Sequence, residues 1–580
     1  MILIDWIIVA IYCVASLVLG VILSKKASQG MESYFAGNRN LSWWLAGTSM
    51  AATAFSSDTP LLVTGITRSK GIWGNWEIWS LAISTMLAVF FFSRLWKRTG
   101  VLTEVELVEL RYAGKPASFL RGFKALYWGF FYNAFIIGAW PMTGLVKVMQ
   151  ETTGWTKPVS IFFCLSLTVI YCSLSGYLGV VLTDLFQFFW AMSGAVILAI
   201  FALQAVGGPG VLVEKLSETD KLSFLPPHSS WSWLAGLFLI QWWAWKNSDG
   251  GGIAVQRMVS CKNEKEAMST MLWFNIAHYV LRSWPWILTG LASLILIPDS
   301  LLTVTQAGKT FIDHERAYPR LITMLLPAGL RGVLVASFFA AFMSTVDSQL
   351  NWGASYLVND FYKRFVKKDA SQSHYVWVSR AIPFLLALAA AGVAFYIRSI
   401  GQIFTFVLNL TAGLGPVYLL RWFWWRVNAW SEITAMIASF ILMMIRASVF
   451  SFLGIPPDPL LQLLYMVLGA ALVWMPATLL TAPVPEVHLK NFFARVSPPG
   501  FWKGFATGKS LEKFWWNPLK DWLVATFALL ATLVGPMEIF LGRGIKGAFL
   551  CGLALGGWVY VKNKFFDRTV SDEVFLNNPL

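Results

Sequence analysis

Long apolar stretches recur along the whole chain and are separated by short polar connections. Most of them approach or exceed the length of about 20 residues that a helix needs to cross the hydrocarbon core of a bilayer. The pattern predicts an all-α polytopic membrane protein with fifteen spans, and it leaves open whether the last two both cross. The predicted spans are residues 2–23, 41–66, 72–96, 120–148, 157–175, 177–206, 231–255, 270–297, 324–358, 376–398, 401–425, 430–453, 459–482, 521–541 and 546–562.

Positive charges gather in alternate connections. The first apolar stretch has no basic segment before it and is followed by Lys25 and Lys26, the reverse of the order in a cleaved signal peptide. Lys and Arg are also frequent at 97–124, whereas the connections at 207–230 and 298–318 are mixed or nearly neutral. Because cytoplasmic loops collect Lys and Arg, we expect the N-terminus to lie outside the cell membrane. The C-terminus is then cytoplasmic if all fifteen spans cross.

The composition excludes several classes of protein. Hydrophobic residues make up 57% of the 580 residues and charged residues only 13%, and the mean hydropathy is +0.61. A soluble enzyme of this size could not bury so much apolar surface, and disordered chains are poor in aromatic residues. The net charge of +15 is explained by cytoplasmic loops. We therefore expect a lipid bilayer rather than nucleic acid as a partner, and no obligate protein partner or enzymatic constellation is indicated.

The predicted span at 41–66 contains a helix breaker and an acid. Small and hydroxyl residues lead to Asp58 and then to Pro60. Pro60 has no backbone N–H and disfavours helical geometry at Thr59, so we expect the helix to break between Phe55 and Thr59. Carbonyl groups freed at such a break cannot face lipid and must line a cavity or hold an ion. The alternative is a simple proline kink.

The predicted span at 231–255 is interrupted in a similar way. It carries Lys246 and Asp249 directly before the glycines at 250–252, which a plain lipid-facing helix has no reason to contain. Interrupted helices in corresponding halves of a chain indicate an inverted-repeat secondary transporter. The predicted domains are an N-terminal span and cytoplasmic loop at 1–40, a first five-span repeat at 41–206, a second repeat at 231–426, and further helices at 430–580 with a basic cytoplasmic or interfacial loop at 483–521.

Hydroxyl groups line one face of the ninth predicted span, and a carboxylate, that of Asp347, borders this face. Hydroxyl and carboxylate oxygens are ligands that suit a hard cation, although small hydroxyl residues also pack membrane helices together. The pattern favours the ion. The residues of the face, at positions i, i+3, i+4 and i+7 of a helix, are Ala341, Ser344, Thr345 and Ser348.

A single acid, Asp184, lies inside the predicted span at 177–206. A carboxylate at this depth in the membrane needs a partner. It can belong to a second cation site, carry a proton or form an ion pair, and the sequence leaves these three roles open.

Three motifs, in this order, resemble those of the sodium:solute symporter family over roughly residues 33–430. Residues 33–44 read SYFAGNRNLSWW and resemble the start of the family's first core helix, SYFxAGRxLxWW. Gln256 and Arg257, followed by residues 261–267, resemble its QRxxAxKxxxEA loop. Residues 343–351 and 359–362 resemble its MSSxxSxLN…xDxY helix. The resemblance implies a five-plus-five inverted-repeat core of the LeuT type, with one extra N-terminal and about four extra C-terminal spans.

The resemblance also implies sodium-driven uptake by alternating access, with Na⁺ as the coupling ion. The common sodium site of the family falls on the carbonyl groups of Ala52 and Phe55 and on Ala341, Ser344 and Thr345. Some members hold a second sodium, and its site falls on Asp184 beside Ser344, Asp347 and Ser348. Asp347 replaces a hydroxyl residue that some members have at this position.

For the solute site, the resemblance points to Glu77 and Ser80 of the second core helix, to His278, and to Trp245 as an aromatic gate. Two positions depart from the family: Trp242 stands in place of an Asn, and Thr59 in place of a Gln. The candidate solute-binding residues are Ser56, Asp58, Thr59, Glu77, Ser80, Trp242, Trp245 and His278.

Indole rings and acids in one cavity suit the faces and hydroxyl groups of a sugar, or a cation. We therefore expect a sodium-coupled symporter of a small polar solute, with a sugar or polyol favoured. The alternatives are a sodium- or proton-coupled carrier of an amino acid, organic acid or quaternary amine, and a sensor or channel with a transporter fold. Arg282 keeps an organic acid open.

Overall fold

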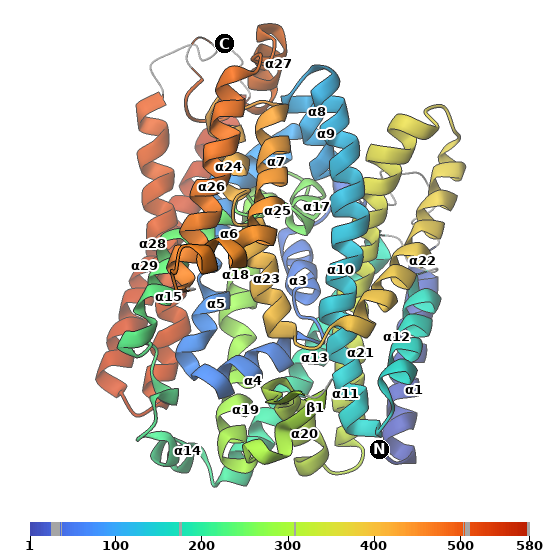
Figure 1. The fold of residues 1–580 in the computed structure, drawn as a ribbon, viewed down its shortest axis with the longest axis vertical. Helices are drawn as coiled ribbons and strands as arrows, with labels where there is room; N and C mark the ends of the chain where they lie inside the picture. Colours follow the sequence, from blue (N-terminus) through green and yellow to red (C-terminus); the bar gives the residue numbers. More distant parts are fainter. Residues whose placement is uncertain are drawn as a thin grey trace.

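The protein folds into a bundle of helices, most of which run along one axis (Figure 1). The computed structural model describes residues 1–24, 35, 37–172, 177–306, 309–456, 458–502, 504 and 511–576. The predicted cytoplasmic charges Lys25 and Lys26 lie outside the described residues. Helices α28 and α29 lie at one edge of the bundle and α1 and α12 at the other, whereas α3 lies near its centre.

The α-helices of the first half are α1 (Leu3–Ser24), α3 (Trp43–Thr53), α4 (Thr59–Lys70), α5 (Trp76–Trp79), α6 (Ala82–Leu87), α7 (Ser93–Thr99), α8 (Leu107–Arg111), α9 (Gly114–Leu126), α10 (Asn133–Ile137), α11 (Thr143–Thr153), α12 (Lys157–Cys172), α13 (Tyr177–Val206) and α14 (Pro209–Leu216). Those of the second half are α15 (Trp231–Gly236), α16 (Trp242–Ala244), α17 (Ile253–Val259), α18 (Glu264–Asn275), α19 (Ser283–Leu296), α20 (Ala317–Leu325), α21 (Leu330–Ser355), α22 (Gln372–Tyr396), α23 (Ile400–Thr411), α24 (Gly415–Phe423), α25 (Ala429–Phe452), α26 (Pro459–Leu480), α27 (Glu486–Val496), α28 (Leu511–Phe540) and α29 (Gly544–Leu576).

Shorter elements complete the chain. The π-helical segments are η3 (Ala88–Phe92), η5 (Tyr127–Tyr132), η6 (Gly138–Met142), η9 (Leu237–Gln241), η10 (Ile276–Leu281) and η13 (Tyr356–Val366). The 3₁₀ segments are η1 (Gly37–Arg39), η2 (Ile72–Asn75), η4 (Glu104–Glu106), η7 (Asp220–Leu222), η8 (His228–Ser230), η11 (Asp299–Leu302) and η12 (His314–Arg316). Strands β1 (Thr303–Gln306) and β2 (Lys309–Ile312) form an antiparallel hairpin in which Val304 pairs with Phe311.

Continuous apolar helices account for most of the predicted spans. In the described residues, ten helices are long and apolar enough to cross a membrane, or eleven if α23 and α24, bent by 44° at their junction, count as one span. Predicted spans that are missing from this count include the two interrupted ones, because each is divided into pieces too short to qualify. The number of fifteen crossings and the limits of the two repeats stay predictions.

Both predicted interruptions are present. Helix α3 ends at Thr53 and α4 begins at Thr59, which leaves residues 54–58 unwound; we call this segment the first break. Pro60 follows at the start of α4, where a missing N–H does no harm. The second break, residues 245–252, separates α16 from α17. Gly250 and Gly252 there have a φ of +75°, a left-handed conformation that glycine adopts without strain.

Helix α21 forms the central wall of the bundle. Within residues 330–366, 89% of an apolar stretch of 18 residues is buried inside the protein, whereas the share for the corresponding stretch of α29 is 17%. Helix α21 packs against α13 and α1, and it also contacts α3 beside the first break. The hydroxyl face of α21 therefore lies against the first interrupted helix. Helix α29 lies at the edge of the bundle.

Candidate functional site

The hydroxyl face of α21 meets the end of α3. Thr345 Oγ1 donates a hydrogen bond to the carbonyl oxygen of Thr53 at 2.8 Å. This places Thr345 and its neighbour Ser344 beside the last turn of α3, next to Ala52 and the first break. A hydroxyl group that donates its hydrogen keeps its lone pairs for a cation. The carbonyl oxygen of Ala52 accepts from the N–H of Phe55 at 2.9 Å, so the backbone forms a turn after α3.

Asp184 of α13 is held by hydroxyl groups from two sides. Ser344 Oγ donates to one of its carboxylate oxygens at 2.6 Å, and Ser49 Oγ of α3 donates to the other at 2.5 Å. The guanidinium group of Arg257 lies 3.5 Å from the same carboxylate, and both side chains are fully buried. Of the three roles that the sequence left open for Asp184, the structure contains the ion pair.

Arg257 connects both interrupted helices. It belongs to α17, directly after the second break, and its guanidinium group donates to Ser348 Oγ at 2.8 Å and to Ser49 Oγ at 3.1 Å. Ser348 in turn hydrogen-bonds Thr53 Oγ1 at 2.8 Å. Arg257 is not among the predicted site residues, although its place in the QR motif beside a broken span was the available signal. The adjacent acid Asp347 is buried on α21.

A cavity of about 300 Å³ lies between the two breaks. Its volume is at the lower end of the range for small-molecule sites. It extends to Thr53 and Thr345, so it is continuous with the hydroxyl face of α21. Five of the predicted solute-binding residues line it, namely Ser56, Asp58, Thr59, Trp245 and His278.

Three predicted solute-binding residues lie elsewhere. Glu77 forms an ion pair with Lys70 at 2.6 Å and lines a separate outer cavity of about 560 Å³. Ser80 is fully buried and does not belong to the lining of either cavity. The ring of Trp242 packs against Trp522 of α28 at 5.5 Å. The resemblance pointed to all three residues, but the orientation of each helix turns these side chains away from the inner cavity.

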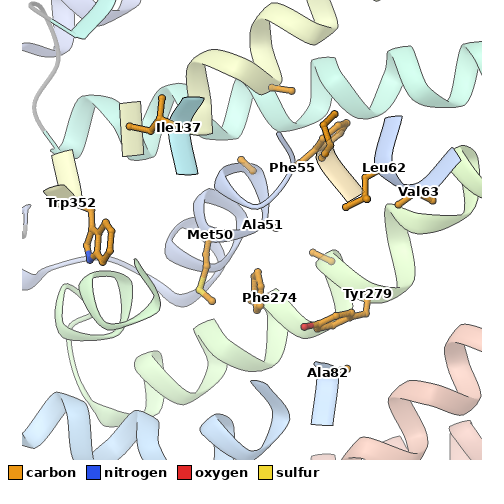
Figure 2. Close-up of a cluster of buried hydrophobic side chains, with 14 of the residues drawn as sticks. Met50, Ala51, Phe55, Leu62, Val63, Ala82, Ile137, Phe274, Tyr279 and Trp352 are labelled. Atoms are coloured by element: carbon orange, nitrogen blue, oxygen red, sulfur yellow. The ribbon is translucent and has the colours of Figure 1, made fainter. Parts of the chain in front are cut away.

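Apolar and aromatic side chains form much of the inner cavity wall. Figure 2 shows Met50 and Ala51 on one short helix, with Phe274 and Tyr279 on the helix beside it. Of these, Met50, Phe274 and Tyr279 line the cavity, and so does Trp352 of α21. Such a wall excludes water and strengthens each polar contact made inside it.

Charged and polar groups lie at fixed points of this wall. One carboxylate oxygen of Asp58 is buried without a hydrogen-bond partner. Arg282 donates to the ring nitrogen Nε2 of His278 at 2.9 Å and stacks on Trp286 at 5.6 Å. The cavity therefore offers a carboxylate, a guanidinium group and hydroxyl groups to a polar solute.

Buried ion pairs stabilise the second break. Asp249 accepts hydrogen bonds from Arg421 of α24 at 2.6 Å and from the indole N–H of Trp422 at 2.8 Å. The backbone N–H of Gly252 donates to Glu104 at 2.6 Å, and Glu104 lies 3.5 Å from Arg421. The sequence identified Asp249 as unusual but gave no indication of these partners.

Several known proteins are similar to this chain in sequence. The sodium/glucose cotransporter 4 of Danio rerio is 24% identical over 538 residues, which cover 84% of this chain and 80% of that protein. The sodium/myo-inositol cotransporter of Bos taurus is 25% identical over 545 residues, covering 84% and 74%. The sodium/glucose cotransporter of Vibrio parahaemolyticus is 24% identical over 469 residues, covering 75% and 83%.

A solved structure shares the fold. The substrate-bound, outward-open state of a Na⁺-coupled sialic acid symporter superposes with a TM-score of 0.67 at 22% identity, over 83% of this chain and 98% of that one. This likeness confirms the predicted inverted-repeat architecture. Residues 34–439 match the sequence model of a single family. The match spans well over half of the 580 residues and includes both breaks and the hydroxyl face of α21, and on this basis the chain belongs to the sodium:solute symporter family.

Proposed function

We propose that this protein imports a sugar or polyol together with sodium by alternating access. The observation that carries the proposal is the single cavity that both breaks line and that reaches Thr345 on α21. A solute in this cavity contacts both interrupted helices at once, and an ion at Thr345 contacts the first of them together with α21. Each ligand then favours the same conformation, which is the basis of reciprocal coupling. The names of the relatives, which include glucose and myo-inositol cotransporters, support the solute class.

The sodium ion in this proposal lies between the end of α3 and α21. Thr345 already ties the two helices together, and a cation at this place would add ligands from both. The ligands are the carbonyl groups of Ala52, Phe55 and Ala341 and the hydroxyl groups of Ser344 and Thr345. Oxygen ligands of this kind suit a hard cation.

The proposal includes one sodium and not a second. Asp184, Asp347 and Ser348 were the predicted second site, but Arg257 lies 3.5 Å from Asp184 and bonds Ser348. A second sodium would have to bind against this guanidinium charge.

The solute contacts the residues that line the inner cavity. Ser56, Asp58 and Thr59 of the first break offer oxygen atoms to sugar hydroxyl groups, and His278 offers a ring nitrogen. Trp245 of the second break presents an indole ring, on which the C–H face of a sugar can stack. Glu77, Ser80 and Trp242 have no part in this binding mode.

The proposed topology places the N-terminus outside and the C-terminus in the cytoplasm. Figure 1 supports it, because α14 and β1 from the nearly neutral connections lie at one end of the bundle with the N-terminus. Helix α8, from a connection rich in Lys and Arg, lies at the opposite end. Labelling of single cysteines introduced in α14 and α8 of intact cells tests this arrangement, and labelling from the outside at α8 would contradict it.

Transport by purified protein in liposomes tests the function. Radiolabelled glucose, myo-inositol, an amino acid and a quaternary amine are supplied under an inward sodium gradient, a proton gradient, or neither. We expect sodium-driven accumulation of a carbohydrate or polyol alone. Uptake that follows the proton gradient and ignores sodium would contradict the coupling ion. Sodium-driven uptake of the amine or amino acid alone would contradict the solute class.

A further inference from the structure

A lysine of the second break lies in the wall of the inner cavity. Lys246 is only 6% exposed. Its ammonium group lies over the rings of Trp128 at 4.8 Å and Tyr132 at 4.7 Å, and it donates one hydrogen bond, to Asn247 Oδ1 at 2.9 Å. An ammonium group has three hydrogens to donate, so Lys246 has the capacity to bind a further acceptor.

No carboxylate of the protein neutralises this charge at close range. Across the described parts of the chain, no Asp or Glu oxygen lies within 4.0 Å of the Lys246 ammonium group. Asp249 and Glu104, which flank the same break, are engaged by Arg421 at 2.6 and 3.5 Å. Glu104 and Asp249 attract the Lys246 charge only from beyond 4.0 Å. A buried ammonium group without a carboxylate in direct contact is costly, so the cavity favours a ligand that brings a negative charge.

A second cation, Arg282, adds to the positive charge of the inner cavity. The Arg282 guanidinium group, which also lines the cavity, is bound by the ring and carbonyl group of His278 and not by an acid within 4.0 Å among the described residues. Because His278 Nε2 faces a permanent donor, this nitrogen accepts and the ring is neutral. Two cations, Lys246 and Arg282, therefore share the cavity with one carboxylate, Asp58.

The outer cavity contains charged groups of both signs, with Lys70 and Arg446 beside Glu77, Asp313 and Glu315. Arg446 of α25 lines it, and its Nη1 is buried without a hydrogen-bond partner. Leu62 belongs to the walls of both cavities, so the two are neighbours.

We propose that the solute is a sugar acid, and that Lys246 is the specificity-determining residue that binds its carboxylate. This inference rests on the proposed function and narrows its solute class. The carboxylate accepts from the free hydrogens of Lys246, while the hydroxyl groups of the sugar contact the first break. Cation–π interactions with Trp128 and Tyr132 keep the ammonium group in place when the cavity is empty.

Sodium-dependent binding to the purified protein tests the inference. The probes are glucuronate, its neutral methyl ester and glucose, which differ mainly in charge, and binding is followed by calorimetry. We expect glucuronate to bind at least tenfold more tightly than the ester or glucose. Equal or weaker binding of glucuronate would overturn the inference but leave the proposed function in place. Absence of sodium-dependent binding for all carbohydrates and polyols tested would overturn both.

Variants then assign the charge preference to one side chain. Lys246→Gln should remove the tenfold preference for glucuronate over its methyl ester, and Lys246→Arg should keep part of it. Lys215→Gln, on the exposed surface of α14, is the matched control and should keep the preference unchanged. A preference for glucuronate that survives in Lys246→Gln would assign it to another residue and contradict the role of Lys246. If Lys246→Gln does not fold, the comparison of acid and ester on the unaltered protein still decides the solute class.

Discussion

The two breaks in the helices of this protein are stabilised by different forces. The first break, residues 54–58, is held by neutral contacts: Ser57 Oγ donates to the carbonyl oxygen of Pro141 at 2.6 Å, and Thr345 donates to Thr53 at 2.8 Å. The second break, residues 245–252, is anchored by the buried ion pair of Asp249 and Arg421 at 2.6 Å. One break is therefore fixed by charge and the other by hydrogen bonds of modest strength.

This difference indicates a division of roles. A neutral hydrogen bond contributes about 0.5–1.5 kcal/mol net, so the first break can exchange its contacts when an ion binds and leaves. Breaking a buried ion pair by removing one partner costs about 3–5 kcal/mol, so the second break should keep its shape through the transport cycle. We infer that sodium acts on the first break, while the second provides a rigid frame for the cavity.

The largest effect is expected from Arg421→Met. The change removes the cation between Asp249 and Glu104 and leaves both carboxylates buried, so the free energy of unfolding should fall by about 3–5 kcal/mol. Thermal unfolding in detergent, followed by tryptophan fluorescence, measures it. Arg364→Met is the control, because Arg364 pairs with Glu109 near the surface and is 39% exposed. Equal stability of the two variants would contradict the rigid role of the second break.

The next effect concerns the first break. Ser344→Ala removes a predicted sodium ligand, and contacts to charged groups contribute about 1.5–3 kcal/mol. The sodium concentration for half-maximal uptake should therefore rise roughly tenfold to a hundredfold, while membrane insertion is kept. Ser337→Ala on the same helix is the control, since Ser337 only bonds the carbonyl groups of Val333 and Trp190. An unchanged sodium dependence in Ser344→Ala would exclude the proposed sodium site.

A smaller effect is expected from Gly250→Ala. The φ of +75° at Gly250 is unfavourable for a residue with a Cβ, at a cost of about 1–2 kcal/mol. The unfolding temperature should fall, and solute affinity should fall with it because the cavity wall is distorted. Gly392→Ala in α22 is the control: it has no atom within 4 Å of the added Cβ and no left-handed backbone. Loss of stability in the control alone would contradict this account of the second break.

The smallest effect is expected from Glu77→Gln. The variant weakens the partly exposed ion pair with Lys70, and pairs of this kind contribute about 0–1 kcal/mol. The amide oxygen of Gln can still accept from the indole N–H of Trp233, which lies 3.3 Å from Glu77. Sodium-driven uptake and solute affinity should stay within about twofold of the unaltered protein, as the corresponding energies are below 1 kcal/mol. A large loss of solute affinity would return Glu77 to the solute site and contradict its placement in the outer cavity.

The sequence was sufficient to predict the features that depend on neighbours along the chain. Apolar stretches are long because each helix must satisfy its own backbone in lipid, and Pro60 and the glycines at 250–252 interrupt helices by local sterics. The i, i+3, i+4 spacing placed Ser344 and Thr345 on one face, and the structure brings that face to the end of α3. These properties are fixed by local geometry, so they could be recognised before the fold was known.

Only the tertiary structure decided which charges meet. Asp249 and Arg421 are 172 positions apart, and Arg257 reaches Asp184 from a different helix, so no local pattern specifies either pair. The same holds for Glu77, Ser80 and Trp242, whose side chains point away from the cavity because packing sets the rotation of each helix. In a medium of low dielectric constant, the energy of a charge depends on what lies within a few ångströms, and that proximity is created by the packing of distant segments.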